Sequence, residues 1–250
     1  MWPYPTVLAH RGGGTLAPEN TLAGLRRGMA AGYRAIEFDV MLARDGVPVV
    51  LHDPFLGRTV PGSGHVYDYD AAELAALDAG GWFARDYEGE PVPLFVEFAQ
   101  FCRAHGVWMN VEIKPAPGYE IETGGTVARI VAAMFADEIA AGDMARVPLL
   151  SSFSHDALAS AREVAPYVPR AFLMSELATD WERRARELEA VAVHTNHRHL
   201  TRAGAEEVKA AGFGLFCYTV NEPARARELL VWGVDAFCTD RIDLIGPDFT

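Results

Sequence analysis

Short apolar segments rich in β-branched residues alternate with stretches of helical periodicity along most of the chain. The pattern predicts strands at residues 6–10, 35–42, 107–113, 147–152, 170–174, 191–194, 214–218 and 236–239. Helical periodicity is clearest at residues 21–31, 95–105 and 126–141. Repeated strand and helix units indicate a parallel sheet, and this number of units favours closure into a (β/α)8 TIM barrel over an open sheet.

The alternation is interrupted after the second strand. Residues 47–51 form a further strand-like segment, which Asp45-Gly46 joins to the preceding strand through a hairpin turn, so it need not run parallel to the rest. From about residue 53 to 93 Pro and Gly punctuate the chain, and only residues 71–77 indicate a helix. We therefore expect a single α/β domain over residues 1–250, with an insertion at about 53–93 over one end of the barrel.

Composition argues against several classes of protein. The 22 basic and 34 acidic residues give a net charge of -12, which argues against a nucleic-acid or anionic-membrane surface. The three cysteines lack the spacing of a disulfide framework or a thiolate zinc site. No segment approaches the roughly 18 apolar residues of a membrane span, and the start of the chain lacks the pattern of a secretory signal. We expect a cytoplasmic protein without a membrane anchor that binds a small molecule; the sequence gives no indication of its oligomeric state.

Three carboxylates lie on strand-like segments that should meet at the mouth of the barrel. Glu37 and Asp39 share one face of their strand because side chains alternate, and Glu112 lies near the end of the next barrel strand. Carboxylates held this close raise one another's pKa unless a cation neutralises them. Oxygen ligands favour Mg²⁺ or Ca²⁺ over zinc, with Mn²⁺ possible. The alternative is an ion-pair network with Arg11, Arg34 or Lys114 in place of a metal.

Two histidines and two cations flank these carboxylates. His10 and His52 each follow an apolar run, and negative neighbours would raise their pKa and support proton transfer. Arg11 and Lys114 would bind phosphoryl oxygens and stabilise the charge that develops on them, or they would pair with the carboxylates alone. Together these residues indicate a metal-assisted phosphodiester site.

Other polar and aromatic residues have less defined roles. Asp53 could orient His52, and Asn20 is expected to cap the helix that starts at residue 21. Phe153 and Tyr218 end later strands and could wall the pocket or belong to the core. The histidine-rich segment at residues 194–199 is interpreted as a turn rather than a zinc site.

Several motifs resemble the glycerophosphodiester phosphodiesterase family, in particular its bacterial cytosolic branch. They are Trp2-Pro3-Tyr4-Pro5, His10-Arg11-Gly12-Gly13-Gly14, Ala17-Pro18-Glu19-Asn20-Thr21, Glu37-Phe38-Asp39, His52-Asp53, Glu112-Ile113-Lys114, Tyr218-Thr219-Val220-Asn221 and the last six residues. The resemblance implies a (β/α)8 barrel that hydrolyses glycerophosphodiesters to glycerol 3-phosphate and an alcohol. It also implies metal ligands at Glu37, Asp39 and Glu112. The catalytic pair would be His10 and His52, and Phe153 fits the substrate-contact pattern.

Two other functions are alternatives to a phosphodiesterase. Gly12, Gly14 and Ala17 fit a G-x-G-x-x-A dinucleotide fingerprint, with Glu37 about 20 residues further on. In an NAD-linked oxidoreductase, however, the helix would begin within the glycines, whereas residues 18–20 delay it here. A non-catalytic glycerophosphodiester-binding protein is the third alternative. The chain offers no activated Ser or Cys nucleophile, so the attacking oxygen would come from water or from the substrate.

Overall fold

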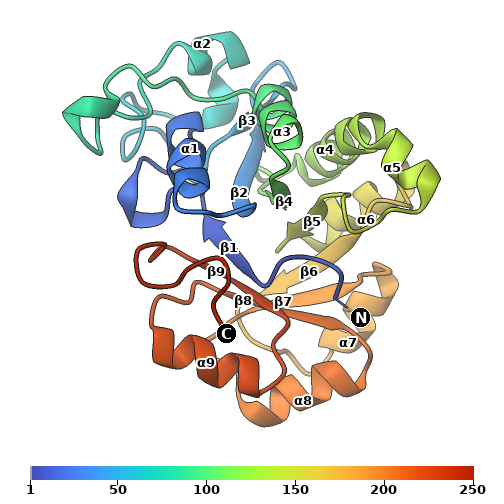
Figure 1. Cartoon of the computed structure of the whole chain (residues 1–250). Helices are drawn as coiled ribbons and strands as arrows, with labels where there is room; N and C mark the ends of the chain where they lie inside the picture. The colour runs from blue at the N-terminus through green and yellow to red at the C-terminus, as the bar shows by residue number, and fades with distance from the viewer. Residues whose placement is uncertain (1) are drawn as a thin grey trace.

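Eight parallel strands close into a barrel that the intervening helices surround (Figure 1). The computed structural model describes residues 2–250. Strands follow one another in the order β1-β9-β8-β7-β6-β5-β4-β2, and the pairing of β1 with β2 closes the ring. The expected (β/α)8 barrel is confirmed. The remaining strand, β3, pairs antiparallel with β2 at the hairpin, as the turn signal predicted.

The strand limits match the expected segments to within about two residues. They are β1 (Val7–His10), β2 (Ala35–Leu42), β3 (Pro48–Val50), β4 (Trp108–Ile113), β5 (Leu149–Ser152), β6 (Arg170–Met174), β7 (Ala192–Asn196), β8 (Gly214–Tyr218) and β9 (Ala236–Thr239). His194 therefore lies within β7, as the strand expected at residues 191–194 predicted, and only its inclusion in the histidine-rich turn is wrong. Its ring is fully buried, because it follows apolar residues on a central strand.

The helices cover the outside of the barrel. They are α1 (Leu22–Ala30), α2 (Ala71–Ala75), α3 (Phe95–Ala104), α4 (Glu120–Met134), α5 (Ala136–Ala141), α6 (His155–Val164), α7 (Trp181–Glu187), α8 (Arg202–Ala210) and α9 (Pro223–Val231). Short 3₁₀ turns occupy Gly14–Leu16, Val66–Asp68 and Arg85–Tyr87. The single helix expected at 126–141 is instead two helices, because the chain turns at Phe135. None of the helices in the described part of the chain is long and apolar enough to cross a bilayer.

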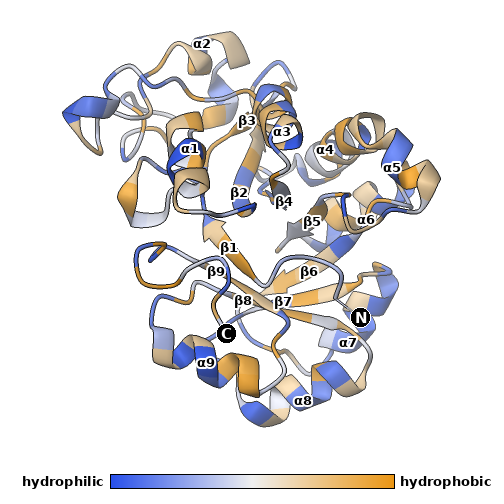
Figure 2. Ribbon diagram, in the orientation of Figure 1, coloured by the Kyte–Doolittle hydropathy of each residue, from blue (hydrophilic) through white to orange (hydrophobic). Residues whose placement is uncertain are grey.

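Apolar side chains form separate cores on the two faces of the barrel strands. Outward residues pack beneath the helices, and a second cluster fills the lower interior of the barrel. Figure 2 shows the strands mainly in hydrophobic colours and the outer helices with hydrophilic stretches. At the end where the strands begin, Tyr4 stacks on Trp108 with ring centroids 4.5 Å apart, so the N-terminal segment covers the floor of the barrel. The three cysteines are free and buried, as expected of small apolar residues.

The segment between β3 and α3 lies against the outside of α1 and the mouth of the barrel (Figure 1). Its own core gathers around Leu74, Val66 and Val92. A carboxylate oxygen of Glu90 accepts a hydrogen bond from the backbone N–H of Ala23 at the start of α1. This irregular segment is therefore held by apolar burial and by contacts with a barrel helix.

The glycine-rich loop after β1 packs directly on α1. Gly12 has φ 89°, and a Cβ placed on Gly28 of α1 would overlap the Gly12 carbonyl oxygen. A Cβ on Gly14 would overlap the carbonyl oxygen of Asp240. The spacing that imitates a dinucleotide fingerprint thus serves close backbone packing beside the mouth of the barrel.

We predict that Gly28→Ala destabilises the protein, although alanine normally stabilises a helix by about 1 kcal/mol relative to glycine. The added methyl group would press on the Gly12 carbonyl, and overpacking of this kind typically costs about 1–3 kcal/mol. Urea unfolding would measure the change. Gly246→Ala is the control, because no atom lies within 4 Å of the place that its methyl group would take, and its free energy of unfolding should hardly change. An unaltered or raised stability of Gly28→Ala would contradict the packing argument.

Candidate active site

Three carboxylates converge at the end of the barrel where the strands finish. Glu37 and Asp39 point to the same side of β2, and Asp39 pairs in register with Glu112 of β4. One oxygen from each of the three lies within 4.8 Å of the other two. Oxygen donors at this spacing could hold a hard divalent cation such as Mg²⁺ or Ca²⁺.

Burial makes this cluster electrostatically unfavourable. Burial raises the pKa of Glu37 well above its usual value, and the charges of Asp39 and Glu112 raise it further. Burial and Asp39 likewise raise the pKa of Glu112 to about 7. Burial also acts to raise the pKa of Asp39, but Lys114 and Arg11 outweigh it and the pKa is lowered. The two glutamates show the expected mutual raising of the pKa, and Asp39 is the carboxylate whose charge the cations neutralise.

Two cations neutralise part of the charge. The Lys114 Nζ lies 3.6 Å from Asp39 Oδ1 and 3.7 Å from Glu112 Oε1. The Arg11 Nε lies 3.5 Å from Asp39 Oδ2. These distances are longer than ordinary charge-assisted hydrogen bonds, so the pairs are loose. Two cations against three carboxylates leave the site acidic, and a bound cation is compatible with the ion pairs.

Arg34 takes no part in this network. Its guanidinium donates to the carbonyl oxygens of Met29 and Tyr33 beside the start of β2. The expectation that Arg34 could neutralise the carboxylates is therefore wrong, because it precedes the strand that carries them. The opposite end of that strand holds the site.

His10 closes β1 between two carboxylates. Its Nδ1 lies 2.5 Å from Asp240 Oδ1, and its Nε2 lies 3.6 Å from Glu37 Oε2. Asp240 is itself fixed, because Asn221 Nδ2 donates to its Oδ2 at 2.9 Å and its own N–H donates to Asn221 Oδ1 at 2.8 Å. Asp240 thereby sets the ring orientation and directs Nε2 toward the carboxylate cluster.

His52 has a similar partner on the other side of the site. Its Nδ1 lies 2.6 Å from Asp53 Oδ1, which supports the orienting role expected for Asp53. Arg58, from the segment between β3 and α3, donates to Asp53 and also to Glu19, at 2.7 and 2.9 Å to the latter. Burial lowers the pKa of His52 although Asp39 opposes it, so the raised pKa expected for this histidine is wrong. This shift favours the neutral ring.

Asn20 belongs to the site rather than to the helix cap. Thr21 caps α1 instead, with its side chain accepting a hydrogen bond from the N–H of Gly24. Asn20 is buried with φ 57°, and its Nδ2 donates to Asp39 Oδ2 at 2.9 Å. Arg11 also has a positive φ, of 51°. Strained backbone in non-glycine residues is tolerated where the surrounding contacts demand it.

Phe153 and Tyr218 lie at the ends of β5 and β8. Their rings pack edge to face with centroids 6.0 Å apart, and the Tyr218 hydroxyl donates to the Met174 carbonyl oxygen at 3.0 Å. Phe153 is about half exposed, at 47%. The pair forms an aromatic side to the mouth of the barrel.

Three residues of the network have no clear signal as site residues in the sequence. Asp240 follows β9, and its place at the end of a barrel strand is a signal that could have identified it. Asn221 ends the Tyr218-Thr219-Val220-Asn221 motif, but no feature of the neighbouring sequence indicates that it binds Asp240. Arg58 lies in a segment without regular secondary structure, where no sequence pattern predicts that it pairs with Asp53 and Glu19.

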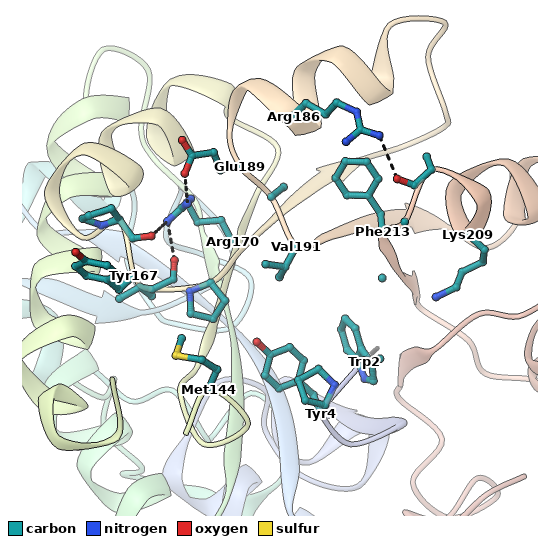
Figure 3. Close-up of a pocket in the computed structure, with 18 residues that line it drawn as sticks. Trp2, Tyr4, Met144, Tyr167, Arg170, Arg186, Glu189, Val191, Lys209 and Phe213 are labelled. Atoms are coloured by element: carbon teal, nitrogen blue, oxygen red, sulfur yellow. Dashed lines mark hydrogen bonds and ion pairs between the residues drawn. The ribbon is translucent and has the colours of Figure 1, made fainter. Parts of the chain in front are cut away.

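A separate hollow of about 840 Å³ lies at the opposite end of the barrel (Figure 3). Trp2, Tyr4 and Phe213 contribute aromatic walls. The charged groups there already have partners: Lys209 pairs with Asp235, and the guanidinium of Arg170 donates to backbone carbonyls. The converging carboxylates, histidines and cations lie at the other end, so we place the chemistry there.

Known proteins match nearly the whole chain. The model of the Glycerophosphoryl diester phosphodiesterase family matches residues 10–244. A glycerophosphodiester phosphodiesterase of Caldanaerobacter subterraneus subsp. tengcongensis is 31% identical over 239 residues, covering 94% of this chain and 93% of that protein.

Solved structures of phosphodiesterases are also similar to nearly the whole chain. An Oleispira antarctica phosphodiesterase in complex with the product sn-glycerol-3-phosphate has 34% identity and a TM-score of 0.85, covering 94% of this chain and 93% of that one. A glycerophosphodiester phosphodiesterase from Agrobacterium tumefaciens has 28% identity and a TM-score of 0.78, covering 96% of this chain and 98% of that one. The alternative of an NAD-linked oxidoreductase is therefore wrong.

We predict that the metal-free protein loses stability as the pH rises from about 4.5 to 7. A carboxyl group whose pKa is higher in the folded than in the unfolded state stabilises the fold while protonated, and this contribution disappears through the folded pKa, about 7 for Glu112. The effect is on the order of 3 kcal/mol. Urea unfolding in chelator at pH 5 to 8 would measure it.

Glu112→Gln is the comparison that isolates this residue. The amide cannot ionise, so the stability of the variant relative to the wild type should increase with pH over that window. His52 titrates in both proteins, so its contribution largely cancels in the difference. Loss of the Glu112 charge also makes the pKa of Glu37 less raised, which changes the difference in the same direction. A constant difference between the two proteins from pH 5 to 8 would show that Glu112 has an ordinary pKa.

Proposed function

The chain belongs to the glycerophosphodiester phosphodiesterase family, and we propose that it hydrolyses glycerophosphodiesters to glycerol 3-phosphate and an alcohol with one divalent cation and two histidines. The observation that carries this proposal is the convergence of Glu37, Asp39 and Glu112 within 4.8 Å, between His10 and His52. Hydrolysis of a phosphodiester needs its negative charge neutralised, a proton removed from the attacking oxygen and a proton supplied to the departing ester oxygen. These side chains offer all three.

Glu37, Asp39 and Glu112 would hold the cation. Their oxygens suit Mg²⁺ or Ca²⁺, with Mn²⁺ as a further candidate. When bound, the cation supplies Lewis-acid stabilisation of a phosphoryl oxygen. The raised pKa values of Glu37 and Glu112 support the assignment, because a positive charge between them would relieve the repulsion.

Arg11 and Lys114 would bind the phosphoryl group from either side of the carboxylates. Their loose contacts of 3.5 to 3.7 Å with the cluster leave N–H groups that a phosphate oxygen could accept from. Glu19 fixes Arg11 by accepting from its Nη1 at 2.8 Å. Fixed cations of this kind stabilise the charge that develops on phosphoryl oxygens without reorganisation.

His10 and His52 would exchange protons with the attacking and leaving oxygens. Each ring has a carboxylate at Nδ1, which selects the tautomer and leaves Nε2 for the substrate. One histidine acts as the base toward water or a substrate hydroxyl, and the other protonates the departing alcohol. The lowered pKa of His52 keeps a base available near neutral pH.

Phe153 and Tyr218 would form an apolar wall for the substrate, and the substrate is a small molecule. The Oleispira antarctica neighbour, crystallised with sn-glycerol-3-phosphate, supports this size class. The net charge of -12 makes a nucleic-acid substrate unsuitable. A non-catalytic glycerophosphodiester-binding protein would bind such a molecule without releasing product, which the assay below distinguishes.

We further propose one domain over residues 1–250, with the insertion at about 53–93 serving the site through Arg58. A cytoplasmic location is the companion proposal. Its support is that Cys102, Cys217 and Cys238 are free and buried, which suits a reducing compartment.

We predict that a chelator abolishes release of glycerol 3-phosphate from glycerophosphocholine and glycerophosphoethanolamine, and that Mg²⁺, Ca²⁺ or Mn²⁺ restores it. Glu112→Gln should weaken cation binding, measured by titration calorimetry, because it removes one negative ligand. Glu122→Gln makes the same chemical change on the exposed side of α4 and should bind the cation as the wild type does. Full activity in chelator would refute the metal proposal.

A second prediction separates proton transfer from metal binding. His10→Ala and His52→Ala should each lower kcat by about 10²- to 10⁴-fold, the usual contribution of a positioned acid or base, with cation affinity retained. His105→Ala is the control, because its exposed ring lies at the end of α3. Loss of cation binding in either site variant would move that histidine from proton transfer to coordination.

A further inference from the structure

The interior of the barrel contains a polar layer at the level of Glu37, which is the lowest of the three carboxylates. In a barrel of this kind four inward side chains from alternate strands form one layer. Because the strands are tilted, the residue that pairs on the next strand lies one residue lower along the barrel axis. Glu37 pairs with Asn110, and Asn110 pairs with Leu149. Two residues further up that strand stands Ser151, which is therefore level with Glu37.

Repeating these two steps completes the ring. From Ser151 the pairings pass through Ala171 and Ala192, and two residues above the latter is His194. From His194 they pass through Phe216 and Ala236, and two residues above the latter is Cys238. The layer thus consists of Glu37, Ser151, His194 and Cys238, with Glu37 opposite His194 and Ser151 opposite Cys238.

Three members of this layer have buried polar atoms without a partner in the protein. They are Glu37 Oε2, Ser151 Oγ and both ring nitrogens of His194. Asn110 Oδ1, one level lower, is in the same condition. Glu37 Oε2 lies 3.6 Å from His10 Nε2, which is too long for a hydrogen bond. Buried polar atoms are rarely left unsatisfied, so a cluster of them indicates a bound polar group.

His194 needs one acceptor and one donor. Burial lowers the pKa of His194 to about 3, so the ring is neutral and carries one N–H and one free nitrogen. The ring stacks on Phe216 with centroids 4.4 Å apart, which fixes its plane. Its edge, with the two nitrogens, is what remains available for hydrogen bonding.

Two of the four side chains in this layer are small. Bulky branched side chains usually fill such layers, whereas Ser151 and Cys238 are small and stand opposite each other. The charge of Glu37 adds to burial in raising the pKa of Cys238, which supports their proximity. A water molecule needs about three hydrogen bonds to polar groups, and this layer supplies that number of donors and acceptors. Among residues 2–250, neither His194 nor Cys238 belongs to a group of three potential ligand atoms within 4.8 Å of one another.

We propose that this layer binds ordered water that links His194 and Ser151 to Glu37, which makes His194 a positioning residue for a proposed metal ligand. The water would satisfy Glu37 Oε2 from below, so that the carboxylate keeps one orientation toward the cation. The positioning role rests on the proposed function, whereas the water itself does not.

The first test is Mn²⁺ affinity, measured by calorimetry on the intact protein. His194→Phe keeps the aromatic volume and the stacking but removes both nitrogens, and it should weaken Mn²⁺ binding by about 10- to 100-fold, as loss of an outer partner does. His194→Gln keeps one donor and one acceptor and should recover most of the affinity. Leu149→Val perturbs the apolar layer below and should bind Mn²⁺ as the wild type does.

Unchanged affinity in His194→Phe, or an equal loss in Leu149→Val, would overturn the positioning role. If the wild type itself fails to bind Mn²⁺, then the metal proposal and the positioning role both fail, and the water is decided separately. That decision needs only the metal-free wild type, in case His194→Phe does not fold.

The second test is a high-resolution crystal structure with ¹⁵N NMR of the histidine rings. We expect ordered water at about 2.7–3.2 Å from a ring nitrogen of His194 and from Ser151 Oγ. The ¹⁵N shifts should report a neutral, hydrogen-bonded His194 between pH 5 and 8. Direct bonds among the side chains, or free ring nitrogens with no water density, would overturn the proposal.

Discussion

The burial of three carboxylates at one end of the barrel is the constraint on which the rest of the structure depends. Glu37 and Asp39 are almost inaccessible, and desolvation is the largest influence on the pKa of each. A protein without a purpose for this cluster would lose little by replacing it with apolar side chains. Its presence explains why two cations, two histidines and a buried amide gather around it, since each either offsets the charge or uses it.

The barrel holds this cluster through register and backbone packing. Parallel pairing brings Asp39 beside Glu112, and the glycines after β1 let the chain approach α1 closely enough to bring Arg11 and Asn20 back over Asp39. Both of these residues accept a positive φ to do so. The strain is local, whereas the compensation is spread over a sheet, a helix and the insertion that provides Arg58.

The sequence was enough to predict the barrel and the groups that carry charge at its mouth, because strand periodicity and the ends of parallel strands are local signals. It could not predict which partner each group takes. Asp240 meets His10 across 230 positions, and Arg58 reaches Glu19 from irregular chain. Asn20 is of a residue type that often caps helices, and only the structure shows that Thr21 caps α1 instead. Burial likewise reverses the shift expected for His52, since a sequence gives neighbours but not solvent access.

The same limit applies inside the barrel, where polar residues would be unfavourable without partners. On the inward faces of their strands, Ser151 follows Leu149 and His194 follows Ala192, so the preceding sequence indicates only a core position. The strand pairings give the position of these residues along the barrel axis, and they lie level with Glu37. This layer places the neutral polar groups of Ser151 and His194 at the level of one carboxylate, Glu37. It also makes the orientation of Glu37 depend on residues that cannot touch a substrate, which joins the chemistry at the mouth to the packing of the core.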